Sequence, residues 1–121
     1  MAFKYIDKIK DLIDVIEKEE KENMEKATEI IVKAILYKKA IFSFGASHAG
    51  ILTEDLYYRA GGLVVINPIF ARNLMLDTSP ITMTSEMERL EGYGTTVANK
   101  TNISEGDVVI VHSVSGRNPV S

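Results

Sequence analysis

The sequence predicts an α/β domain, a three-layer αβα arrangement in which helices cover both faces of a parallel sheet. Three short apolar runs, Ile41–Phe44, Leu63–Ile66 and Val108–His112, have the length and residue types of buried strands. Stretches with helical periodicity separate these runs, and strands that alternate with helices are typical of a parallel sheet. No glycine or proline precedes Gly45, so long helices are expected to come before the first strand.

The first forty residues carry an apolar stripe on an otherwise charged helical pattern. Four isoleucines recur at helical spacing: Ile6, Ile9, Ile13 and Ile16. Residues 17–23 are wholly polar, so a break or bend is expected there. A narrow stripe placed ahead of the first strand has little sheet to cover. We therefore expect residues 1–38 to form a helical segment that packs against another subunit.

The stretch Ile41–Gly62 is predicted to be a strand, a small-residue loop and a helix that stops at Gly61-Gly62. A loop of this kind presents backbone N–H groups to an anion such as a phosphate. Neither common nucleotide motif is present: no Lys-Ser/Thr pair follows Gly50, and Ser47 replaces the middle glycine of G-x-G-x-x-G. The alternative is an ordinary strand-to-helix turn.

Later elements follow the same alternation. Asn67-Pro68 ends the second strand, and residues 69–83 read as irregular. Ser85 and Glu88 match a capping box that would start a helix over residues 85–97, interrupted by Gly92 and Gly94. The third strand runs into a loop, Ser113–Asn118, whose following helix is missing. We therefore expect the chain to be the N-terminal part of a longer domain.

Composition excludes several classes of protein. The net charge of −3 leaves no basic surplus for nucleic acid, and the absence of cysteine excludes disulfides, thiolate metal sites and cysteine nucleophiles. Without a signal-like apolar region or a membrane span, a cytoplasmic protein with no membrane partner is expected. No cofactor is expected. A metal site is not expected either, because the spacings of His48, His112 and Glu54 match no metal signature.

Two polar loops are expected to share one crevice. In a doubly wound sheet ordered 2-1-3, the first and third strands are neighbours, and their carboxyl-end loops meet at the switch point. Hydroxyls, backbone amides and one guanidinium would then converge: Ser47, His48, Ser113, Ser115, Gly116, Arg117 and Asn118. This combination suits a phosphate dianion.

Three segments in order carry a family resemblance: TEDLYYRAGG at 53–62, ERLEGY at 88–93 and HSVSGRNP at 112–119. Together they resemble the SIS (sugar isomerase) phosphosugar-binding domains, most closely a branch of uncharacterised bacterial proteins about twice this length. The resemblance extends over essentially all 121 residues. It implies a five-stranded parallel sheet in flavodoxin-like order, with residues 39–121 forming the N-terminal part of the domain. It also implies assembly as a homodimer or homotetramer.

The resemblance further implies a bound sugar phosphate, with the phosphate held by Ser113, Ser115, Gly116, Arg117 and Asn118, and by Ser47 from the first loop. Glu54 would be the base that removes a C2 proton, and His48 would open the sugar ring or orient the substrate. The implied reaction is aldose–ketose isomerisation or elimination next to a carbonyl; the alternative is a non-catalytic phosphosugar sensor. The residues alone leave an alternative for each of these roles. Glu54 would be a carboxylate favoured by the helix N-terminus, and His48 and His112 would be packing residues in the loops.

Overall fold

The computed structural model describes residues 3–121, which divide into two compact units at the boundary between Lys33 and Ala34. Each unit is described by itself. Within the described residues, no helix is both long enough and apolar enough to cross a membrane.

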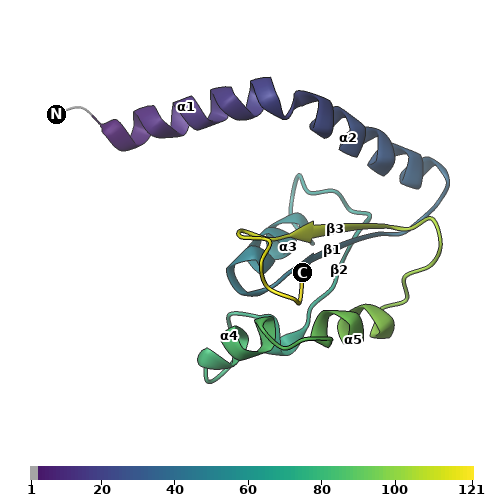
Figure 1. Ribbon diagram of the computed structural model, residues 1–121. Coiled ribbons are helices and arrows are strands. Elements are labelled where there is room, and N and C mark those ends of the chain that lie inside the picture. Colours follow the sequence, from purple (N-terminus) through teal and green to yellow (C-terminus); the bar gives the residue numbers. More distant parts are fainter. Residues whose placement is uncertain (1–2) are drawn as a thin grey trace. The chain divides into compact units, whose positions relative to one another are not determined.

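The N-terminal unit consists of helix α1 (Lys4–Glu19) and most of helix α2 (Lys21–Leu36) (Figure 1). The helices are interrupted at Glu20, inside the polar stretch where a break was predicted. No residue of α1 is buried, and the side chains of Ile6, Ile9, Ile13 and Ile16 are between 37% and 58% exposed. The predicted apolar stripe is therefore an unpartnered surface of this unit.

The second unit is built on a three-stranded parallel sheet with the order β2-β1-β3, which confirms the predicted order (Figure 1). Strand β1 is Ile41–Gly45, β2 is Ile66–Pro68 and β3 is Val108–His112. Both β1 and β3 lie where the sequence predicted them. Asp107 links the residue before β1 to the turn before β3, because its two carboxylate oxygens accept hydrogen bonds from the backbone N–H groups of Ala40 and Ser104.

The prediction for β2 is wrong at both ends, since Leu63–Val65 lies outside the sheet and Asn67-Pro68, expected to end the strand, is part of it. Ile66 pairs with Ile41, the first residue of β1, so the three residues before Ile66 would need a strand partner before Ile41. That partner is absent because the chain turns there, with Lys38 in the left-handed region at φ 55°.

The helices of this unit differ in their bounds from the prediction. Helix α3 (Gly50–Leu56) follows a 3₁₀ turn at Ser47–Ala49 and ends before Arg59, because Tyr57 is extended and Tyr58 has φ 49°. The helix predicted over residues 85–97 is two helices, α4 (Thr82–Glu88) and α5 (Tyr93–Lys100), so the predicted interruption at Gly92 is confirmed, whereas Gly94 lies within α5.

The capping-box prediction is also wrong, because Ser85 lies inside α4 and Glu88 is the last residue of that helix. The chain is broken at Gly92, whose φ of 76° is a left-handed conformation that a helix cannot contain.

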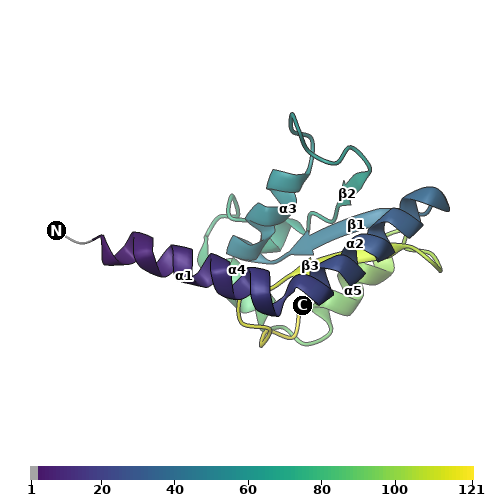
Figure 2. The same ribbon diagram turned by 90° about the horizontal axis from the view of Figure 1, so that it is seen from above.

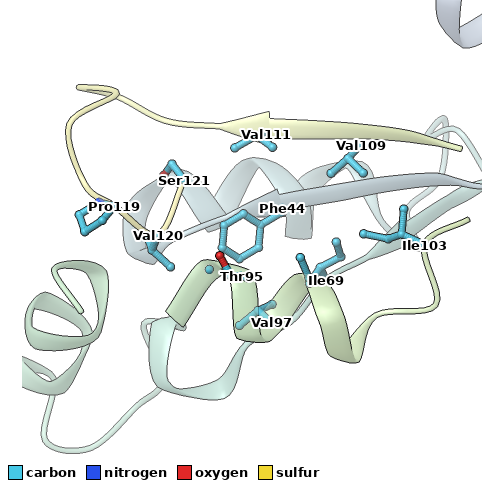
Figure 3. Close-up of a pocket in the computed structure, with 12 residues that line it drawn as sticks. Phe44, Ile69, Thr95, Val97, Ile103, Val109, Val111, Pro119, Val120 and Ser121 are labelled. Carbon is cyan, nitrogen blue, oxygen red and sulfur yellow. The ribbon is translucent and has the colours of Figure 1, made fainter. Parts of the chain in front are cut away.

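Helices cover both faces of the sheet. Figure 1 shows α4 and α5 beneath the strands, and Figure 2 shows α3 alongside β1 and β2. Alternation along β1 sends Ser43 toward α3 and Phe44 toward α5. In Figure 3, Phe44 is directed at Val97 and lies close to Val120, in an apolar hollow of about 310 Å³. The core therefore lies beneath the strands, and each carboxyl-end loop contributes a residue to it, Ala46 after β1 and Val120 after β3.

Candidate functional site

The loops that follow β1 and β3 enclose a small polar pocket of about 190 Å³. They meet because β1 and β3 are hydrogen-bonded neighbours, with Gly45 opposite His112 at their ends. Polar side chains from both loops and from α4 line the pocket: Ser47, His48, Glu88, His112, Ser113, Ser115, Asn118 and Ser121. Five of the residues expected at this crevice are therefore brought together, namely Ser47, His48, Ser113, Ser115 and Asn118.

Ser47 is the most constrained of these residues. Its backbone has φ 49°, in the left-handed region that costs a non-glycine residue about 1–2 kcal/mol. The side chain is buried, and its Oγ has no hydrogen-bond partner among the described residues. Buried hydroxyls in proteins are almost always satisfied. A strained serine with an unsatisfied hydroxyl at a pocket wall is what a bound polar ligand would explain.

The loop after β3 is held at three points. Ser113 Oγ accepts a hydrogen bond of 3.0 Å from the N–H of Gly116, which closes a tight turn in which Gly116 has φ 61°. The Asn118 side-chain amide donates to Glu88 Oε2 at 2.7 Å and so ties the loop to α4. Val120 is buried in the core. Ser115 and Arg117 lie between these anchors and are exposed to solvent. The loop therefore presents both side chains from a segment that is fixed on either side.

His112 lines the pocket from the end of β3 and is held from behind by two buried hydroxyls. Its Nε2 lies 3.0 Å from Ser43 Oγ, which lies 3.0 Å from Thr53 Oγ1 on α3. Ser43 and Thr53 are 0% and 1% exposed. Burial lowers the pKa of His112, because it disfavours the charged imidazolium. The neutral ring thus joins β1, β3 and α3 behind the pocket.

This burial makes the stability of the protein depend on pH. In the unfolded chain His112 protonates near its ordinary pKa of about 6.5, whereas in the folded chain it protonates only at lower pH. Below about 6.5 the unfolded state therefore binds more protons, and the free energy of unfolding falls as the pH falls. We expect urea titrations to show that the free energy of unfolding falls between pH 7 and pH 5. His112→Gln should reduce the slope of this free energy against pH. An identical slope in both proteins would contradict the assignment.

Three expected site residues do not line the pocket. Glu54 is exposed on α3 and does not line the pocket. Gly116 and Arg117 belong to the loop but are outside the lining, and Arg117 is exposed. The support for an anion site at the start of α3 is also reduced, because this helix has only seven residues. Among residues 3–121, no three His, Asp or Glu side chains gather in a way that could hold a metal ion.

Sequence reasoning missed Glu88 as a pocket residue. It assigned this residue to a capping box, a local pattern that says nothing of distant contacts. The only sequence signal that pointed to Glu88 was its place in the ERLEGY segment, one of the three segments that carried the family resemblance.

Comparisons with known proteins agree with that resemblance. A family model described as the SIS domain matches residues 4–121. A UPF0309 protein of Shouchella clausii is 51% identical over 97% of this chain and 48% of its own length. A UPF0309 protein of Oceanobacillus iheyensis is 44% identical over the same shares. One from Streptomyces coelicolor is 30% identical over 97% of this chain and 47% of its own length. The chain thus spans about half the length of the curated relatives it matches.

Proposed function

The chain belongs to the SIS domain family, and we propose that its polar pocket binds a phosphorylated sugar. The observation that carries this proposal is the buried, unsatisfied Oγ of Ser47 at the wall of a pocket rich in hydroxyls. A phosphate group accepts hydrogen bonds from hydroxyls and backbone N–H groups, and it pairs with arginine. Ser47, Ser113 and Ser115 supply the hydroxyls.

Arg117 supplies the charge in this proposal. Its side chain is exposed and forms no ion pair with any described residue, so it is available to an incoming dianion. The guanidinium fork binds phosphate oxygens in pairs, which a lysine would not do. We therefore place the phosphate between the serine hydroxyls of the pocket and Arg117 at its mouth.

The chemistry beyond binding is a finer proposal, namely aldose–ketose isomerisation or elimination next to a carbonyl. Both reactions need a base that reaches the proton on the carbon beside the carbonyl. Glu54, the residue expected to be that base, lies outside the pocket. This position favours the second candidate, a phosphosugar-binding sensor. A turnover screen against aldose and ketose phosphates decides between them, since only an enzyme converts the sugar that it binds.

The test of binding uses two exposed loop residues that are proposed to contact the phosphate. Ser115→Ala and Arg117→Ala are each expected to weaken sugar-phosphate binding by about 1.5–3 kcal/mol, the scale of a hydrogen bond to a charged group. Isothermal titration with hexose 6-phosphates measures the loss. Ser85→Ala and Arg89→Ala, at exposed positions outside the pocket, are the matched controls and should bind as the wild type does. Unchanged affinity in both pocket variants would remove this loop from the site.

We also propose that residues 1–38 mediate assembly with a second copy of the chain. The exposed isoleucine stripe of α1 is the surface, and the distribution of charge along the helix favours an antiparallel pair. Residues 4–10 contain three lysines and one aspartate, whereas residues 11–19 contain four acidic residues and one lysine. Antiparallel copies would set the basic half of each helix against the acidic half of the other.

A further inference from the structure

Glu88 carries the one acidic side chain among the described residues that line the pocket. It is half-buried at the end of α4, and its Oε2 accepts the 2.7 Å hydrogen bond from Asn118 Nδ2. A carboxylate at this end of a helix gains nothing from the helix dipole, which disfavours negative charge there. Within the described part of the chain no lysine, arginine or histidine forms an ion pair with it. Helix stability and charge pairing therefore do not account for Glu88.

The charge of Glu88 restricts where an anion can lie in the pocket. A phosphate dianion beside a carboxylate would be repelled, so the phosphate belongs with the hydroxyls of Ser47, Ser113 and Ser115. The space next to Glu88 then suits groups that donate hydrogen bonds. An ionised carboxylate offers about four lone-pair sites, and the Asn118 amide occupies one of them. The remaining sites are open to hydroxyl donors.

We propose that Glu88 recognises the sugar part of the ligand by accepting hydrogen bonds from its hydroxyl groups. The proposal rests on the proposed function, because it assumes that the phosphate end is bound by the serine loop. Glu88 and the serines then act at opposite ends of one ligand. The carboxylate repels the phosphate and attracts the polyol, so it fixes the direction in which the sugar enters. Its proposed role is to position the sugar and to set specificity.

Glu88→Gln tests the proposal with little change of shape. The glutamine oxygen can still accept the hydrogen bond from Asn118, so the loop after β3 keeps its anchor. The hydrogen bonds from sugar hydroxyls lose their charged acceptor, while the repulsion of phosphate disappears. We expect the affinity for the tightest-binding hexose 6-phosphate to fall by about ten-fold or more, and that for inorganic phosphate to stay equal or rise. The preference for sugar phosphate over phosphate is thus the quantity to measure.

Glu86→Gln and Glu91→Gln are the matched controls, since they remove the same charge from exposed positions outside the pocket. Both should keep the wild-type preference. If Glu88 serves only to hold the loop, Glu88→Gln will bind both ligands as the wild type does, or lose both in proportion, and either result overturns the inference. A wild-type protein that binds hexose phosphates no more tightly than phosphate also overturns it. Failure to bind phosphate or any sugar phosphate would instead refute the proposed function.

Discussion

Replacing Ile9 and Ile13 together with glutamate is expected to convert an assembled protein into monomers. Both side chains belong to the exposed stripe of α1, and in a two-fold pair each substitution would act twice. Burial of one isoleucine contributes about 1.5–3 kcal/mol. Losing four such burials, and placing carboxylates in an apolar contact, should raise the dissociation constant by at least about a thousand-fold. Size-exclusion chromatography with light scattering measures the mass.

Lys18→Glu is the control for this change. It alters the net charge by the same two units, because a lysine becomes a glutamate, but its position is on the helix face opposite the isoleucines. The control should keep the mass of the wild type. A double variant that keeps that mass as well would show that the stripe is not the contact between copies.

The parts of the fold that depend on local pattern could be predicted from the sequence. The runs Ile41–Phe44 and Val108–His112 are apolar over a strand length and became β1 and β3. Their pairing brought the two serine-containing loops together as expected. The break between α1 and α2 followed from a polar stretch in an otherwise striped helix. The strands and the break between the helices depend on residues within a few positions of each other, whereas the pairing of β1 with β3 follows from the strand order of a doubly wound sheet.

The parts that failed depend on distant contacts or on backbone conformation. The start of β2 depends on where its partner β1 begins, because Ile66 pairs with Ile41, 25 residues earlier in the chain. The interruption at Gly92 was predicted, but the bounds of α4 and α5 on either side of it were not. The place of Glu88 depends on Asn118, 30 residues away in the chain. A capping-box pattern takes no account of such distant contacts. It therefore predicted a local role for Glu88, whereas the structure places this residue in the pocket.

Gly45→Ala is expected to disrupt the pocket by displacing the turn that follows β1. Gly45 ends β1, and the turn that carries Ser47 and His48 folds back directly onto it. A Cβ at position 45 would lie 2.5 Å from the carbonyl oxygen of Ala49 and 2.8 Å from the backbone nitrogen of Gly50. Backbone atoms cannot yield as a flexible side chain does. The turn must therefore move, at a cost of about 1–3 kcal/mol in the free energy of unfolding.

The loss of binding should exceed the loss of stability, because the displaced turn carries the Ser47 hydroxyl that the proposed ligand would satisfy. Gly61→Ala is the matched control: a Cβ there meets nothing within 4 Å, although the φ of 77° is unfavourable for alanine. We expect the control to be destabilised by about 1 kcal/mol and to bind sugar phosphate normally. Folded Gly45→Ala protein, identified by its cooperative urea transition, should show no binding in the titration that saturates the wild type. Normal affinity in that variant would mean that the ligand does not touch the turn at Ser47.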